Sequence, residues 1–143
     1  SDFVKMADEF IPQKFKDSLN EAYLDSGSLT TFLFEICHPN DPHIIPEKYG
    51  AHLIGSRQVK SNLPYSTNKV KEAFLDIIAE RYGFYRPEWF SDKFGNIMKM
   101  AKECKHEGYV VYGRKSNTAL KIKSPYYLVL KLFTFTNCKY REV

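Results

Sequence analysis

The segment from residue 108 to residue 123 constrains the fold most strongly. Two short runs of β-forming residues, Gly108–Tyr112 and Ala119–Lys123, are separated by the turn-forming stretch Gly113–Asn117. Runs of this length, joined by a short polar loop, are typical of a β-hairpin. Because a hairpin pairs its two strands antiparallel, the sequence predicts a fold that contains antiparallel β-structure.

The rest of the chain predicts further strands and several helices. Segments rich in branched and aromatic residues favour strands, while apolar residues at intervals of three and four favour helices. The expected strands are Leu29–Cys37 and Ala51–Val59, and the expected helices lie in 2–25, with a second helix starting near Pro12, in Asn68–Tyr82 and in Pro87–Glu103.

Residues 126–135 fit either state, because their aromatic and branched content favours a strand while the spacing of Leu128 and Leu132 favours a helix.

Gly83 is expected to end the helix that precedes it. Trp89 is expected to pack in the core. We therefore expect an α+β fold, mainly antiparallel sheet with packed helices. Because no Gly/Ser/Pro-rich linker divides residues 1–143, we expect them to form a single unit.

Composition narrows the class of protein. The chain has 143 residues, of which 43% are hydrophobic and 27% charged, as in globular proteins. No apolar run approaches the ~20 residues of a membrane-spanning helix, and the first residues do not have the pattern of a secretory leader. The three cysteines form no C-x-x-C pair, which favours a reducing compartment and argues against a disulfide scaffold or structural zinc. The formal charge of +4 mildly favours a polyanionic partner.

Three local features could carry chemistry. Glu35 interrupts an apolar strand and would face away from Phe34 and Ile36, toward a groove or solvent. Glu107 precedes a glycine at a strand start, where a carboxylate could hold a hard cation. Lys121 and Lys123 would share one strand face, suited to a polyphosphate. Each feature alone is equally compatible with an ordinary solvated surface.

The order of these features resembles the later motifs of the covalent nucleotidyltransferases, the ATP-dependent ligases and mRNA capping enzymes. The chain is most similar to the phage-type RNA ligase that repairs cleaved tRNA, and the resemblance covers almost its whole length. The segments that carry it are Phe34-Glu35 with Pro39, Leu53-Ile54-Gly55-Ser56-Arg57, Arg81-Tyr82, Pro87-Glu88-Trp89, Glu107-Gly108-Tyr109-Val110, Lys121-Ile122-Lys123-Ser124 and Tyr126-Tyr127.

The resemblance implies a role for individual residues. Glu107 would lie near the catalytic metal, the two lysines of K-x-K would contact nucleotide phosphates, and the strand carboxylate would contact the ribose. The adenine would lie between an aliphatic side chain of the middle strand, with Ile54 the neighbouring alternative, and the hydrophobic residue of E-G-x-V. The residues concerned are Glu107, Lys121, Lys123, Glu35, Leu53 and Val110.

By the same resemblance the chain is the later part of a nucleotidyltransferase domain in an ATP-dependent RNA ligase. Such an enzyme joins RNA 5′-phosphate and 3′-hydroxyl ends, for example those of a tRNA-like substrate, through enzyme–AMP and RNA-adenylate intermediates. The implied cofactors are ATP and Mg²⁺ or Mn²⁺, and the implied location is the cytoplasm, of a host cell if the protein is phage-encoded. A membrane partner is not expected.

The chain also departs from the family. It contains no K-x-D-G, the motif whose lysine attacks ATP, and we expect that motif before Ser1. The family's C-terminal helical domain is also missing from these 143 residues, and Asp41-Pro42-His43 stands where relatives tend to have Asn-Arg. The alternatives are a non-catalytic nucleotide- or RNA-binding module, a DNA ligase or capping guanylyltransferase, and a structural domain with chance motifs.

Overall fold

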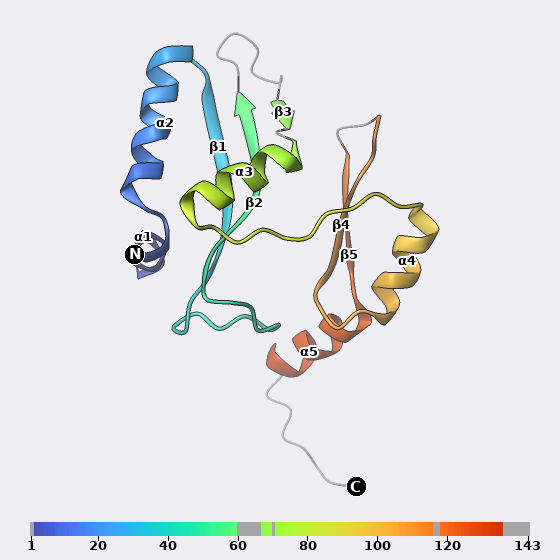
Figure 1. The fold of residues 1–143 in the computed structure, drawn as a ribbon. Coiled ribbons are helices and arrows are strands. Elements are labelled where there is room, and N and C mark those ends of the chain that lie inside the picture. The colour runs from blue at the N-terminus through green and yellow to red at the C-terminus, as the bar shows by residue number, and fades with distance from the viewer. Residues whose placement is uncertain (1, 60–66, 70, 116–117, 136–143) are drawn as a thin grey trace, which may run out of the picture. The chain divides into compact units, whose positions relative to one another are not determined.

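The computed structural model describes residues 2–59, 67–69, 71–115 and 118–135, and over this part the fold is α+β with antiparallel sheets, as predicted (Figure 1). The chain divides into two compact units. The first contains residues 1–42 and 48–89, and the second contains residues 43–47 and 90–143.

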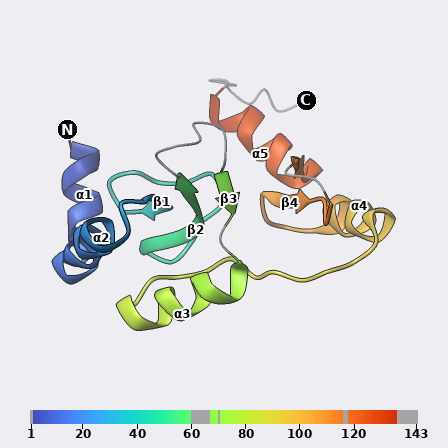
Figure 2. The ribbon, with the colours of Figure 1, turned by 90° about the horizontal axis from the view of Figure 1, so that it is seen from above.

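The first unit is a three-stranded antiparallel sheet with helices packed against it. Strand order is β1-β2-β3, and α2 lies along β1 while α3 lies along β2 (Figures 1 and 2). The elements are α1 (Asp2–Phe10), α2 (Gln13–Ser26), β1 (Leu29–Cys37), β2 (Gly50–Val59), β3 (Thr67–Lys69) and α3 (Glu72–Tyr82).

Aromatic rings form the centre of this unit. The buried Phe15 of α2 meets four other rings edge-on, with centroid separations of 5.1 to 5.7 Å. Edge-to-face pairs contribute about 0.5–1.5 kcal/mol each beyond the area they bury. Core packing therefore accounts for part of the aromatic content of the chain. The four partner rings are Phe32, Phe34, Tyr82 and Phe84.

The second unit is the predicted hairpin with two helices. It contains α4 (Phe94–Glu103), β4 (Gly108–Tyr112), β5 (Ala119–Lys123) and α5 (Pro125–Phe135). Strands β4 and β5 pair antiparallel, and α4 contacts both strands and α5. Helix α4 buries Ile97 and Ala101.

Two predicted helices begin later than the sequence suggests. The helix expected from Asn68 begins at Glu72, because Thr67–Lys69 pairs with β2 as a third strand. The helix expected from Pro87 begins at Phe94. Gly83 does end α3, with a φ of 78° that suits glycine.

The prediction that Trp89 packs in the core is wrong. The Trp89 side chain is 53% exposed, and its indole N–H donates to a carboxylate oxygen of Asp76 at 2.8 Å. The hydrogen bond to Asp76 keeps the chain before α4 from continuing the helix toward Trp89.

Residues 126–135, for which the sequence pattern is compatible with a strand or a helix, are helical. Cys37 is buried and Cys104 is partly buried, whereas Cys138, loop residues 116–117 and Val70 lie outside the described residues.

Candidate functional site

One face of the β4–β5 hairpin carries both lysines of the K-x-K pattern. Side chains alternate along a strand, so Lys121 and Lys123 share a face with their cross-strand partners Val110 and Gly108. Val110 is 45% exposed, and Lys121 is exposed beside it. We call Val110, Lys121 and Lys123 the hairpin face. It combines an aliphatic surface with two cations, which suits a flat apolar group attached to phosphates.

The opposite face of the hairpin packs against other residues of the second unit. Tyr109 pairs with Ile122 across the strands, and both are partly buried. The Tyr109 ring meets the Phe90 ring at 5.8 Å and the His106 ring at 5.0 Å, both edge-on. The hairpin therefore has one side packed against its own unit.

The glycine of E-G-x-V has a structural explanation. Gly108 has a φ of 132°, and a Cβ placed on it would lie 1.9 Å from the carbonyl oxygen of Ile122. No side chain fits there, because the backbone of β5 occupies the space that a Cβ would need. Glu107 is thereby held at the start of β4.

Glu107 and Lys123 form an ion pair at the end of the hairpin face. The Lys123 ammonium also lies 4.6 Å from the centre of the Tyr127 ring, within cation–π range. Both charged side chains keep partial solvent exposure. Lys121, by contrast, makes no ion pair with any described residue. The two lysines of the pattern therefore stand in different electrostatic surroundings.

Ser124 connects this ion pair to helix α5. Its fully buried hydroxyl donates to the carbonyl of His106 and accepts the backbone N–H of Tyr127 at 3.0 Å. Its own N–H donates to the carbonyl of Glu107 at 2.9 Å. Ser124 is thus the N-cap of α5, followed by Pro125 at the first helical position. The cap fixes the ring of Tyr127 beneath Lys123.

Two other candidate residues lie on the first unit. Glu35 is exposed on β1, while its neighbours Phe34 and Ile36 pack in or against the core. Leu53 of β2 is fully buried in that core, so its side chain offers a ligand no surface. The accessible aliphatic side chain here is the neighbouring Ile54, which is 38% exposed.

A β-bulge separates these two neighbours. Phe34 pairs with Leu53 and Leu33 pairs with Gly55, so Ile54 has no partner on β1. The extra residue shifts the alternation of β2 by one position, so even-numbered and odd-numbered side chains exchange faces at the bulge. This shift explains why apolar and polar residues do not alternate strictly along residues 51–59 of the sequence.

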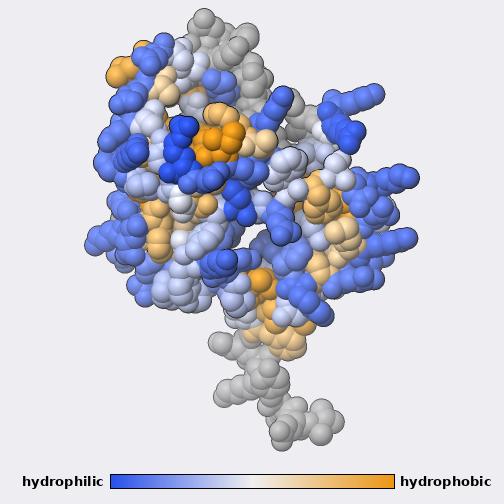
Figure 3. Space-filling model, in the orientation of Figure 1, coloured by the Kyte–Doolittle hydropathy of each residue, from blue (hydrophilic) through white to orange (hydrophobic). Residues whose placement is uncertain are grey.

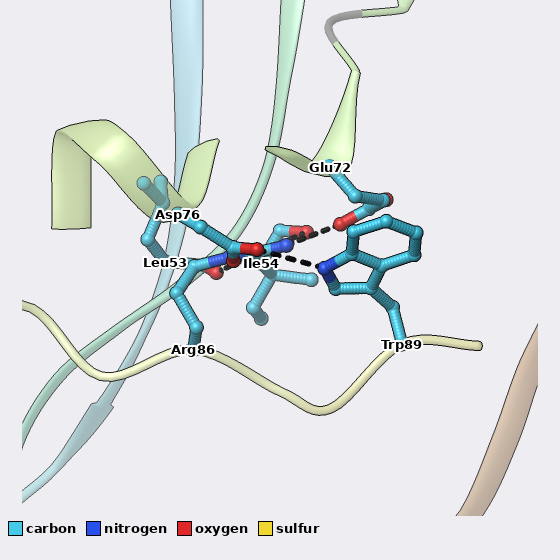
Figure 4. Close-up of polar contacts among 6 residues, drawn as sticks. All are labelled: Leu53, Ile54, Glu72, Asp76, Arg86 and Trp89. Atoms are coloured by element: carbon cyan, nitrogen blue, oxygen red, sulfur yellow. Dashed lines mark hydrogen bonds and ion pairs between the residues drawn. The ribbon is translucent and has the colours of Figure 1, made fainter. Parts of the chain in front are cut away.

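The region around residues 81–89 forms a polar clamp (Figure 4). The guanidinium of Arg86, nearly buried, donates to Asp76 at 2.9 Å and to the carbonyl of Leu53 at the bulge, and it forms an ion pair with Glu72. The Trp89 indole and the Arg86 guanidinium hold the pKa of Asp76 below its ordinary value of 3.8. The contacts of the Arg86 guanidinium therefore join α3 to β2.

The predicted site residues fall into two groups. Glu107, Val110, Lys121 and Lys123 come together on the hairpin of the second unit, and Glu35 and Leu53 lie on adjacent strands of the first. Within the described residues, no three carboxylate, imidazole or thiol side chains gather as a metal site. None of the described helices has the length and apolar character needed to cross a bilayer.

No protein-family model, curated protein or solved structure matches the chain.

Proposed function

We propose that the chain is the later part of the nucleotidyltransferase domain of an ATP-dependent RNA ligase, and that its hairpin face binds ATP. The observation that carries this proposal is the open face on which Val110, Lys121 and Lys123 lie together, with Glu107 paired to Lys123 at its end. Cytoplasmic RNA repair in a phage-like setting is the role that the resemblance suggests.

The chemistry of the face supports a division of roles. Lys121 and Lys123 present two ammonium groups on one rigid strand, and each can contact phosphate oxygens as a point charge with three donors. Val110, half-exposed beside Lys121, provides an aliphatic surface for the adenine ring. Glu35 and Leu53 lie on the first unit, and their ribose and adenine contacts stay predictions of the resemblance, with Ile54 the accessible neighbour of the buried Leu53.

The residues present could hold a divalent cation only if the nucleotide supplies further ligands to it. Glu107 is a single carboxylate, and Mg²⁺ is commonly held by one or two carboxylates, substrate phosphates and water. When bound, Mg²⁺ or Mn²⁺ would neutralise charge on the transferring phosphoryl group. Glu107 would supply the protein's ligand to it.

Binding of a fluorescent ATP analogue with Mg²⁺ tests this proposal. We expect the wild-type chain to bind it, and Lys121→Ala and Lys123→Ala to weaken binding by about tenfold or more each, as loss of a charge-assisted contact does. Lys99→Ala, an exposed lysine on α4, is the matched control and leaves affinity unchanged. Equal affinities for all four proteins would contradict the proposal.

The second candidate is a non-catalytic nucleotide- or RNA-binding module, because the face formed by Val110, Lys121 and Lys123 would serve binding without catalysis equally well. For either candidate, incubation with radiolabelled ATP and Mg²⁺ followed by denaturing electrophoresis gives no labelled band, since no nucleophilic lysine of that motif is present. A stable band would show that another residue accepts AMP. Preferential competition by GTP would instead favour a capping-type enzyme.

A further inference from the structure

The positive charge of the chain is concentrated in the second unit. Residues 43–47 and 90–143 contain 11 lysines and arginines against 5 acidic residues, a formal charge of +6. The other residues contain 10 basic and 12 acidic residues, or −2. The two lysines of the hairpin face account for only part of this excess, so a second basic feature needs an explanation.

Helix α4 presents part of that charge on its outer side. Because Ile97 and Ala101 are buried, the opposite side of the helix faces outward. Lys99 and Lys102 lie there, exposed and three residues apart, so their side chains are neighbours. Glu103 is the one acidic residue within the helix. Figure 3 shows hydrophilic side chains along the right edge of the view, where α4 lies, beside a smaller apolar patch.

The tip of the hairpin adds charge near the start of the same helix. Arg114 donates to the hydroxyl of Ser91 at 2.8 Å, which holds its guanidinium beside the segment that leads into α4. Lys93 is exposed at the N-cap position of the helix. We call Lys93, Lys99, Lys102 and Arg114 the α4 basic surface.

An aromatic side chain accompanies these cations. Phe94, the first residue of α4, is 54% exposed and follows Lys93 directly. Cations that contact phosphates, combined with exposed rings on which bases stack, are typical of surfaces that bind single-stranded nucleic acid. An anionic membrane fits less well, because the outward side of α4 carries Lys99, Lys102 and Glu103 and no large apolar side chain.

We infer that the α4 basic surface binds the backbone of single-stranded RNA, at a place distinct from the hairpin face. The choice of RNA rests on the proposed function, whereas the polyanion itself follows from charge and exposure. Lys99 and Lys102 would contact phosphates, and Phe94 would stack on a base. The surface would hold the strand whose end is to be joined.

The test is fluorescence anisotropy of a labelled single-stranded RNA of about 16 nucleotides, the upper site size of a single-strand-binding fold, with the full 143-residue chain. Binding is measured between about 50 and 200 mM salt. Replacing Lys99 and Lys102 together by Gln is expected to reduce the slope of log K against log salt by about 1.4, since each phosphate contact on a single strand contributes about 0.7. An unchanged slope would overturn the inference.

Two further variants sharpen the result. Lys14→Gln with Arg81→Gln removes two exposed cations from the first unit and is expected to leave the slope unchanged. Phe94→Ala is expected to weaken binding by about fivefold or more without changing the slope, because stacking is not electrostatic. An equal loss of slope in the control double variant would mean that net charge alone attracts RNA, and would overturn the assigned surface.

The outcomes separate this inference from the proposed function. If the wild-type chain does not bind the ATP analogue but binds RNA through Lys99 and Lys102, the ligase proposal fails and the RNA surface stands. If Lys99→Gln/Lys102→Gln keeps ATP-analogue binding and RNA binding is unchanged, this inference fails alone. Sedimentation with phosphatidylserine vesicles that requires the same lysines, without RNA binding, would identify a membrane surface and also overturn it.

Discussion

Lys123 and Glu107 form an ion pair across the start of the hairpin, so the proposed phosphate contact and the proposed metal ligand neutralise each other. A metal-free nucleotide must compete with Glu107 for Lys123, and a free metal ion must compete with Lys123 for Glu107. A metal–nucleotide complex offers both groups a new partner at once. The pair therefore favours simultaneous binding of nucleotide and cation.

Glu107→Gln tests this coupling. The variant frees Lys123, so affinity for the ATP analogue in the presence of EDTA is expected to rise about two- to fivefold, in line with the ~0.2–1 kcal/mol of an exposed ion pair. Affinity with Mg²⁺ is expected to fall, because the metal loses its carboxylate. Glu103→Gln removes a nearby charge without touching the pair. Identical behaviour of the two variants would show that the ion pair plays no part.

Gly108→Ala is expected to disrupt the hairpin. The added Cβ would meet the backbone of Ile122, and alanine disfavours the φ of 132°, so we expect a loss of about 3 kcal/mol or more in the free energy of unfolding, with loss of nucleotide binding. Gly95→Ala in α4 is the matched control, since no other atom lies within 4 Å of a Cβ there. It is expected to stabilise by about 0.5–1 kcal/mol in urea unfolding. Equal effects would contradict the strand geometry.

Asp76 makes the first unit sensitive to acid. Its lowered pKa means that the folded state favours the ionised carboxylate. The resulting stability is complete above the ordinary value of 3.8 and is lost as the pH falls below it, toward the folded-state pKa. Fluorescence of Trp89, the only tryptophan, reports the clamp directly. Asp76→Asn is expected to remove this acid transition, whereas Glu80→Gln, an exposed α3 variant, retains it.

Ser124→Ala is expected to destabilise the second unit by about 1–2 kcal/mol. The variant leaves the Tyr127 N–H and the His106 carbonyl without their partner, and an N-cap loss alone typically costs ~1 kcal/mol. Hydrogen exchange should accelerate at Tyr127. Thr134→Ala removes an exposed hydroxyl bond to the carbonyl of Leu130 on the same helix and should change stability much less. Similar losses in both variants would argue against a capping role.

Local patterns in the sequence were sufficient for much of the fold. The hairpin bounds 108–112 and 119–123 and the strand 29–37 follow from composition and turn residues within short windows. The state of residues 126–135 was also decidable, because Ser124-Pro125 is a helix-start signal that outweighs the strand propensity of the residues after it.

Other features depend on contacts between distant residues. The bulge at Ile54 is accompanied by Arg86, which donates to the Leu53 carbonyl from 33 positions away. The pairing of Thr67–Lys69 with β2 and the tie of Trp89 to Asp76 likewise override local helix propensity. For the same reason the sequence placed both lysines of K-x-K on one face but could not reveal that one of them is paired with Glu107.

The most direct test of the central claim is a map of backbone amide chemical shifts during titration with ATP and Mg²⁺. We expect the largest changes at Val110, Lys121 and Lys123, with smaller changes on the outer side of α4, and we expect Lys121→Ala to abolish them. A titration that leaves the amides of β4 and β5 unmoved, or that shifts them equally in Lys121→Ala, would contradict a nucleotide site on the hairpin face.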